Sequence, residues 1–172
     1  MSFSLEIRVK KEEEIVALAD YQKEASADDL LNADGFIVPV LNGEALLDTD
    51  SGEFEADPLI GLVNNWMQKM PWLIGGDEEC VPLRNSPFCY GFEPVGNAVR
   101  FYFYEGTEGD VENLILEPVS VSLADLCNAS LDMANTIVDA TADSAGEPEE
   151  LSELSAILSE FKEAWNRKKH ER

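Results

Sequence analysis

Residues 88–105 read Phe-Cys-Tyr-Gly-Phe-Glu-Pro-Val-Gly-Asn-Ala-Val-Arg-Phe-Tyr-Phe-Tyr-Glu, and this stretch predicts a β-hairpin. Gly96-Asn97 is the expected two-residue turn, because glycine tolerates the positive φ that a type II′ turn requires at its first central position. With Val95 opposite Ala98, one face of the hairpin carries mostly aromatic side chains. They are Phe88, Tyr90, Phe92, Val99, Phe101 and Phe103. Aromatic cross-strand pairs are typical of a sheet surface that faces a core.

The opposite face of this hairpin predicts an ion pair between Glu93 and Arg100, beside Tyr102 and Tyr104. Pro94 falls at a position where its missing N–H points away from the paired strand. The first strand of the hairpin is therefore expected to lie at the edge of its sheet.

The rest of the chain carries both strand and helix signals. Good helix formers with three glutamates near the start predict a helix over 11–25. Asp57 is expected to cap a helix with apolar residues at i, i+3 and i+4, which Pro71 ends. The other expected elements are a strand over 3–10, a helical turn over 28–31, a hairpin over 36–47 around Asn42-Gly43, acidic loops over 48–57 and 75–79, a strand over 114–121, a helix from Ser122 to Gly146 and a last helix that begins at Pro148.

These elements predict an α+β fold, with a mostly antiparallel sheet of five or six strands built from hairpins, one helix between the hairpins and two C-terminal helices. A length of 172 residues fits one domain, expected over 1–166 and followed by a basic tail over 167–172. An apolar fraction of 45% indicates a chain with a core rather than a disordered one. The absence of a recognisable signal peptide or membrane-spanning run predicts a cytoplasmic protein.

The charge distribution is the main functional signal in the sequence. The net charge is −23, from 35 acidic and 12 basic residues. Lys and Arg are absent between Lys23 and Lys69 and again between Arg100 and Lys162, while four of the twelve basic residues lie in the last six positions. Such a surface repels nucleic acid and anionic membranes, and it attracts basic partners.

Three acidic regions are the candidate surfaces for binding such a partner. Asp125, Asp132 and Asp139 recur every seven residues and therefore share one face of the predicted helix. The other two regions are loops, whose candidate residues are Asp50, Glu53, Glu55, Asp77, Glu78 and Glu79. Two other interpretations of the acidity stay open. One is the ordinary solvated face of an amphipathic helix, and the other is adaptation to a salt-rich habitat.

The sequence contains few residues in patterns that serve catalysis or cofactor binding. His170 is the only histidine and lies in the basic tail, so Ser–His and Cys–His nucleophile pairs are not expected. Cys80, Cys89 and Cys127 lack the spacing of metal ligands, and no glycine-rich phosphate loop occurs. We therefore predict a non-enzymatic protein with no catalytic residues, no cofactor and no metal. Acid–base catalysis by a pair of carboxylates stays open, because 35 acids produce close pairs by chance.

A cluster of Trp and Met residues surrounds the end of the helix that Pro71 is expected to stop. It consists of Trp66, Met67, Met70 and Trp72. Core packing is the first expectation for these side chains. A protein-binding anchor is the alternative, because Trp and Met are enriched at interfaces.

The layout over residues 36–140 resembles that of the immunity proteins encoded beside bacterial polymorphic toxins. The resemblance rests on the acidity, the hairpin-rich middle and the stretch Pro118-Val-Ser-Val-Ser-Leu-Ala-Asp-Leu-Cys127, which leads into a long helix. It implies a cytoplasmic protein that binds and blocks one toxin, often a basic one. It implies no particular fold and no site residue, because that group contains many unrelated folds.

The sequence therefore favours an acidic protein that sequesters or inhibits a basic protein partner. A nucleic-acid mimic is the special case in which that partner itself binds nucleic acid. The alternative is a structural or accessory subunit of a larger assembly, related to phage or to secretion, whose acidity serves only solubility or salt tolerance. The edge strand near Pro94 or the last helix would then make the contact.

Overall fold

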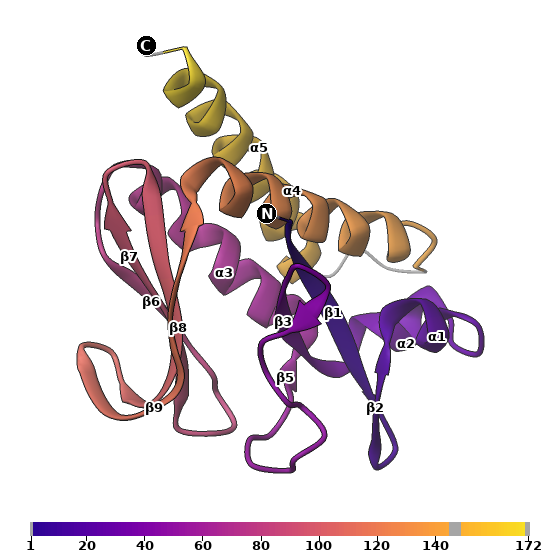
Figure 1. The fold of residues 1–172 in the computed structure, drawn as a ribbon. Coiled ribbons are helices and arrows are strands. Elements are labelled where there is room, and N and C mark those ends of the chain that lie inside the picture. The colour runs from indigo at the N-terminus through magenta and orange to yellow at the C-terminus, as the bar shows by residue number, and fades with distance from the viewer. Residues whose placement is uncertain (1, 145–148, 171–172) are drawn as a thin grey trace.

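The structure is a computed structural model that describes residues 2–144 and 149–170. Its fold class is α+β, as predicted (Figure 1). The elements are β1 (Phe3–Lys11), β2 (Glu14–Ala17), α1 (Leu18–Gln22), α2 (Ala27–Leu31), β3 (Asp34–Leu41), β4 (Glu44–Ala45), β5 (Asp57–Pro58), α3 (Leu59–Ile74), β6 (Glu79–Pro82), β7 (Phe88–Val95), β8 (Ala98–Thr107), β9 (Asp110–Ser122), α4 (Leu123–Ala140) and α5 (Glu149–Lys169).

The strands form two antiparallel sheets instead of a single one. The first sheet has the order β2-β1-β3-β4, with β5 also paired to β3, and the second has the order β6-β7-β8-β9. Both predicted hairpin turns are confirmed. Asn42 and Gly43 have φ of 52° and 82°, as a type I′ turn requires, and Gly96 has φ of 63°.

The central hairpin has the predicted register, with Val95 opposite Ala98 and Phe92 opposite Phe101. Every side chain of the predicted aromatic face is buried. On the other face, Arg100 Nη1 lies 3.5 Å from the Glu93 carboxylate, which confirms the predicted ion pair. The turn, the alternation and the cross-strand charges therefore all specify the same register.

The edge position predicted for β7 is wrong. β6 pairs with residues 89–92 of β7, so β7 lies inside the sheet. This pairing ends opposite Phe92, which leaves Pro94 beyond the partner strand and spares it a lost hydrogen bond. Pro94 therefore costs the sheet no hydrogen bond, as its position in the hairpin predicts. The sequence does not predict β6, because a four-residue strand next to the acidic loop 75–79 gives too weak a pattern.

Residues 11–25 do not form the predicted helix. The chain turns at Glu12, which has φ of 57°, and returns as β2 with Val16 opposite Val9. Only Leu18–Gln22 are helical, as α1. The glutamates favour a helix, but the β-branched neighbours Ile15 and Val16 suit a strand, and pairing with β1 decides the outcome.

Helix α3 differs from its prediction at both ends. Its N-cap is Pro58, without a side-chain cap, so Asp57 does not have the predicted role. The helix also passes through Pro71 and ends at Ile74. Pro71 removes one backbone hydrogen bond, and the last turn persists because Met70 and Leu73 are both buried in the core.

The two C-terminal helices are present. The Ser122 hydroxyl accepts from the Asp125 backbone N–H at 3.0 Å, as the predicted cap of α4 requires. α4 ends at Ala140, before Gly146, which lies outside the described residues together with Pro148. α5 continues to Lys169, so the first three residues of the predicted basic tail, 167–169, form the last turn of this helix.

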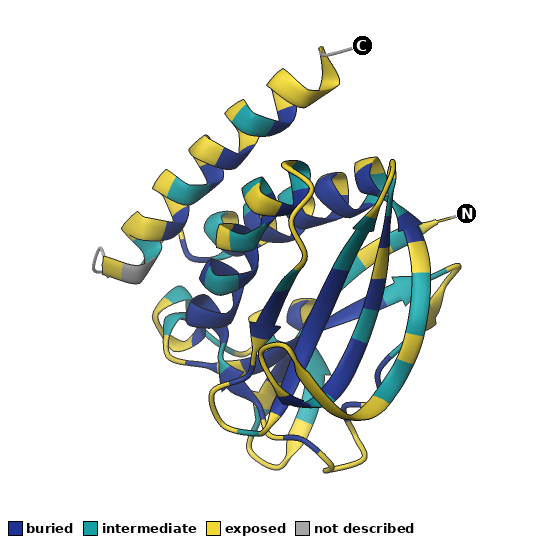
Figure 2. Cartoon of the chain, turned by 90° about the vertical axis from the view of Figure 1, so that its left-hand side faces the viewer, coloured by how far each residue is buried: buried dark blue, intermediate teal, exposed yellow. Residues whose placement is uncertain are grey.

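One hydrophobic core joins both sheets to α3, α4 and α5. Trp66 is fully buried within it and contacts the rings of Tyr90, Phe92 and Phe101. Of the predicted Trp and Met cluster, only Trp72 is exposed, at 60%. α5 packs on α3 and α4, and Figure 2 shows exposed residues along its outward side.

Candidate functional site

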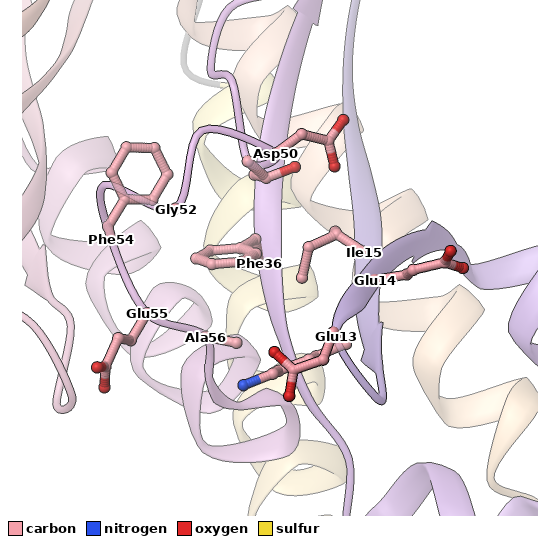
Figure 3. A pocket seen from close by; sticks show the side chains of 11 residues that line it. Glu13, Glu14, Ile15, Phe36, Asp50, Gly52, Phe54, Glu55 and Ala56 are labelled. Atoms are coloured by element: carbon pink, nitrogen blue, oxygen red, sulfur yellow. The ribbon is translucent and has the colours of Figure 1, made fainter.

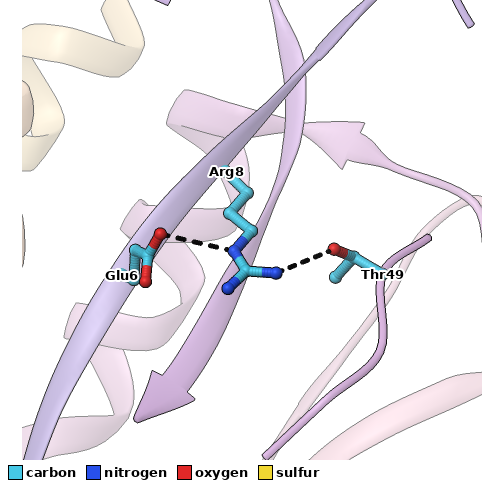
Figure 4. A network of polar contacts seen from close by, with 3 residues as sticks. All are labelled: Glu6, Arg8 and Thr49. Carbon is cyan, nitrogen blue, oxygen red and sulfur yellow. Dashed lines mark hydrogen bonds and ion pairs between the residues drawn. The ribbon is translucent and has the colours of Figure 1, made fainter. Parts of the chain in front are cut away.

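The acidic loop between β4 and β5, residues 46–56, is fixed at its start by a polar network (Figure 4). Arg8 on β1 donates from Nη1 to Thr49 Oγ1 at 3.5 Å, and from Nε to the Glu6 carboxylate at 3.4 Å. Thr49 is 4% exposed, so the loop is anchored near its start.

The loop is fixed at its end by Asp57. This side chain is 2% exposed, and its carboxylate accepts from the backbone N–H groups of Arg84 at 2.6 Å and Asn85 at 3.0 Å. The Asn85 side chain in turn donates to the Ala56 carbonyl at 2.9 Å. Asp57 therefore joins the acidic loop to the connection between β6 and β7, which explains why it does not cap α3.

Between these anchors the loop is shaped by its own turn residues. The Asp48 carboxylate accepts from the Asp50 N–H at 3.0 Å, and Ser51 Oγ donates to the Asp48 carbonyl at 3.0 Å. Side chains of this kind fold back on their own backbone and stabilise turns. The carboxylate of Asp50 thus projects from an ordered turn.

Phe54 holds the middle of the loop against both sheets. Its ring centroid lies 5.7 Å from that of Phe36 on β3, 5.4 Å from Phe88 on β7 and 5.3 Å from Phe103 on β8. All three contacts are edge-to-face, a favourable arrangement for aromatic pairs. Since Phe54 is 6% exposed, its neighbours Glu53 and Glu55 are carried to the surface.

The loop forms one wall of a pocket of about 510 Å³, hereafter the acidic pocket. The opposite wall comes from the β1–β2 hairpin and carries Glu13 and Glu14. Ile15, Phe36 and Phe54 supply the apolar lining, and Figure 3 shows Phe36 and Ile15 between the acidic side chains.

The electrostatic balance of the acidic pocket is strongly negative. Glu13, Glu14, Asp50 and Glu55 contribute carboxylates, and Lys10 is the one basic residue among the described residues that line it. All four acidic residues are exposed, so their carboxylates are hydrated and accessible to a cationic group of a partner. An apolar lining under carboxylates suits a lysine or arginine side chain, whose stem packs on the lining while its charged end meets the carboxylates.

The structure separates the predicted binding residues into different places. Asp50 and Glu55 meet in the acidic pocket, with Glu53 exposed on the same loop. The helix residues Asp132 and Asp139 are exposed on α4, and Asp125 is half-buried in its first turn. Figure 1 shows α4 at the opposite end of the molecule from the acidic loop, so the two regions do not form one surface.

The third predicted region forms a different pocket, of about 420 Å³, on the second sheet. Glu78 and Glu79 line it together with Glu108 and Cys80, whereas Asp77 is exposed on the loop before β6. Glu79 is already paired with Lys69 at 3.5 Å. The Cys80 thiol donates a hydrogen bond to the Cys89 sulfur, and this bond, together with burial, raises the pKa of Cys80, so this thiol stays protonated at neutral pH. This second-sheet pocket is therefore a weaker candidate for binding a cation than the acidic pocket is.

Glu13 and Glu14 are the site residues that sequence reasoning missed. The sequence places them near the start of a predicted helix over 11–25, whereas Glu13 lies in the β1–β2 turn and Glu14 begins β2, in a hairpin that faces the acidic loop. The signal that pointed to the hairpin was the β-branched pair Ile15-Val16, continuing the alternation of β1.

Replacing Asp57 with alanine is expected to lower the free energy of unfolding by about 2 kcal/mol, because two backbone N–H groups lose their acceptor at a buried site. Urea unfolding of the purified chain measures the change. Asp57→Asn keeps the shape and one acceptor oxygen, so we expect it to cost about half as much. Equal stability of Asp57→Ala and the parent chain would show that the carboxylate does not anchor the loop.

The comparisons with known proteins add nothing to these geometric observations. Neither protein-family models, nor curated proteins, nor solved structures gave a match to the chain. Within residues 2–144 and 149–170, no group of three or more His, Cys, Asp or Glu side chains is arranged to hold a metal ion. No helix in the same ranges is long and apolar enough to cross a bilayer.

Proposed function

We propose that this chain is a non-catalytic binding protein of the cytoplasm that sequesters or inhibits a basic protein partner, as an immunity protein does. The observation that carries the proposal is the acidic pocket, where carboxylates from the β1–β2 hairpin and from the β4–β5 loop surround an apolar lining. A lysine or arginine side chain of the partner enters this pocket. The net charge of −23 steers the partner towards it.

The fixed loop supports this function energetically. Binding orders side chains and loops, and a surface that is already ordered loses less entropy on binding. Thr49, Phe54 and Asp57 are all buried and hold the acidic loop at three points. The pocket can therefore present Asp50 and Glu55 without first folding the loop, a property that a solvated acidic tail lacks.

The proposal predicts that removing two pocket charges weakens binding far more than removing two charges elsewhere. The double variant Asp50→Asn/Glu55→Gln is expected to bind a blocked hexa-arginine peptide about tenfold more weakly, since it loses two carboxylate partners. Isothermal titration calorimetry at about 0.1 M ionic strength, where long-range attraction is partly screened, measures the affinity.

The matched control is Asp132→Asn/Asp139→Asn, which makes the same change in net charge on α4. We expect it to weaken binding by less than about twofold at this ionic strength. Equal losses in the two double variants would mean that the peptide responds to total charge alone, and the acidity would then fit habitat better than recognition. Capture of a basic protein from lysate by the control but not by the pocket variant would identify the partner.

A second candidate function is a subunit of a larger assembly, and the edge of the second sheet favours it. β9 is a 13-residue edge strand whose first half is exposed, including Val111 at 47% and Leu114 at 40%. Such an edge can pair with a strand of another chain. Self-association that survives about 1 M salt, where the Debye length is about 3 Å, would support this function over the acidic pocket.

A further inference from the structure

Two of the three cysteines are neighbours on the outward face of the second sheet. Cys80 on β6 pairs with Gly91 on β7, and Cys89 lies two residues before Gly91 on the same strand. Successive side chains of a strand point to opposite faces of a sheet, and Val81 and Tyr90 belong to the hydrophobic core. Cys80 and Cys89 therefore share the other face, as diagonal neighbours on adjacent strands.

The two thiols form a short chain of hydrogen bonds. The Cys80 thiol donates to the Cys89 sulfur. The Cys89 thiol donates to the Gly106 carbonyl oxygen, and these sulfur and oxygen atoms are 3.6 Å apart. Both cysteines are buried and neither forms a disulfide. The contact between the two sulfurs makes this pair different from Cys127, which packs in the core on α4.

The position of the pair suits a disulfide that forms with some strain. A disulfide requires Cβ atoms about 3.5–4.5 Å apart, and diagonal neighbours of two strands lie somewhat farther apart than that. Closing the bond therefore requires a small shift of one strand. β6 has only four residues and lies at the edge of its sheet, so it is the strand that can shift. A strained disulfide is also more easily reduced than an ordinary structural one.

A pocket gives a small oxidant access to this pair. Cys80 lines the second-sheet pocket of about 420 Å³, and its neighbours in the lining include Tyr102, Tyr104 and Glu108. Cys80 is 6% exposed, whereas Cys89 is 1% exposed and does not line the pocket. A molecule little larger than water that enters this pocket therefore meets Cys80 first, with Cys89 behind it.

The hydrogen bond between the thiols gives them different chemical roles. It lowers the pKa of Cys89 to about 7, although burial and the charge of Glu108 act in the opposite direction. Cys89 is therefore partly a thiolate at neutral pH, and it can accept the proton of Cys80 along the existing hydrogen bond. Thiolates are the nucleophilic form of cysteine. Cys89 thus serves as the base that activates Cys80 at the wall of the pocket.

We propose that Cys80 and Cys89 form an oxidation site, at which hydrogen peroxide converts the two thiols into a disulfide. In the first step the Cys80 sulfur attacks one peroxide oxygen while its proton passes to Cys89. The O–O bond breaks, and the products are a sulfenic acid on Cys80 and a hydroxide ion. The hydroxide takes up the proton that Cys89 had released to solvent and becomes water.

In the second step the Cys89 sulfur attacks the Cys80 sulfur and displaces its hydroxyl group. The S–O bond breaks as the S–S bond forms, and the hydroxyl leaves with the Cys89 proton as a second water. In total, two thiols and one hydrogen peroxide give one disulfide and two waters. The two electrons that reduce the O–O bond come from the two sulfurs. Disulfides of this transient kind are the ones that occur in reducing compartments.

The experiment exposes the folded full chain to hydrogen peroxide at neutral pH with a metal chelator, and then alkylates the remaining thiols in denaturant before mass spectrometry. We expect a monomer that has lost two hydrogen atoms and that is alkylated at Cys127 alone, instead of at all three cysteines. Proteolytic peptides are expected to locate the new bond between Cys80 and Cys89. Dithiothreitol added before alkylation is expected to restore three alkylated cysteines.

Three single variants test the roles of the two thiols. Cys89→Ser is expected to slow the oxidation of Cys80 by about tenfold or more, because the chain loses the base that accepts the Cys80 proton. Cys80→Ser is expected to leave Cys89 reduced over the same time, because Cys89 does not line the pocket. Cys127→Ser is the matched control. It removes a buried thiol outside the pocket and is expected to leave the rate of disulfide formation unchanged.

The parent chain alone decides whether the bond forms, so this outcome requires no variant to fold. Three alkylated cysteines after peroxide treatment would overturn the proposal, as would a disulfide between two copies of the chain. Oxidation of Cys89 at the parent rate in Cys80→Ser would overturn the order of the two steps. These outcomes are independent of the proposed function, because neither cysteine lines the acidic pocket.

Discussion

Replacing Trp66 with alanine is expected to lower the free energy of unfolding by about 4 kcal/mol, the largest effect that we predict for a single substitution. The side chain is 0% exposed and lies where α3, the second sheet and α4 meet. Its ring centroid is 5.2 Å from that of Tyr90 and 4.9 Å from that of Phe92. Its removal leaves a cavity that three separate elements would have to close.

The hydrogen bond of Trp66 adds to this effect. Its Nε1 donates to Ser130 Oγ at 3.0 Å, and that hydroxyl donates to the Met70 sulfur at 3.5 Å. Trp66→Phe keeps most of the aromatic contacts and loses the hydrogen bond, so we expect a loss of about 1–2 kcal/mol. Urea unfolding with a shared slope for all variants gives the values. A loss below about 1 kcal/mol for Trp66→Ala would show that the core repacks around the gap.

The elements that sequence reasoning predicted well are those in which every local signal agrees. The central hairpin has a turn glycine, alternating aromatic residues and a cross-strand ion pair, all in one register. The start of α4 was equally clear, because Ser122 caps a helix with a continuous buried stripe. Agreement between local and long-range preferences is what makes a segment predictable.

The elements that it missed depend on partners far away in the chain. β6 has four residues and exists because β7 lies beside it. Residues 11–17 have helix propensity, but residues 14–17 form strand β2 instead, because they can pair with the edge of β1. Asp57 looked like a helix cap because it precedes α3, but the backbone of Arg84 and Asn85, 27 and 28 residues further on, captures its carboxylate.

The candidate site was predictable only in part for the same reason. Asp50 and Glu55 were recognised from the charge of their loop, but nothing local shows which other acidic residues face them. Glu13 and Glu14 reach the acidic pocket through the β1–β2 hairpin, which the helix prediction for 11–25 excluded. The stripe Asp125, Asp132 and Asp139 had the clearest periodicity, yet it lies on a helix face far from that pocket (Figure 1).

Replacing Phe54 with alanine is expected to lower the free energy of unfolding by about 3 kcal/mol and also to weaken hexa-arginine binding at least tenfold. The stability loss follows from the three aromatic contacts of Phe54 with Phe36, Phe88 and Phe103. The binding loss follows from position, because Phe54 lies between Asp50 and Glu55 on the loop and lines the pocket. Urea unfolding and calorimetry, both on the purified chain, measure the two effects.

Trp66→Ala is the control that separates these two effects. Both substitutions remove a buried aromatic side chain, but only Phe54 lies in the acidic pocket. Under conditions where each variant stays folded, we expect Trp66→Ala to bind the peptide with the affinity of the parent chain. Phe54→Leu restores apolar contact to both sheets and should recover most of the stability and of the binding. Equal peptide affinities of Phe54→Ala and Trp66→Ala would mean that binding does not require a fixed position of the loop carboxylates. The peptide would then be attracted by net charge and not recognised by a pre-formed pocket.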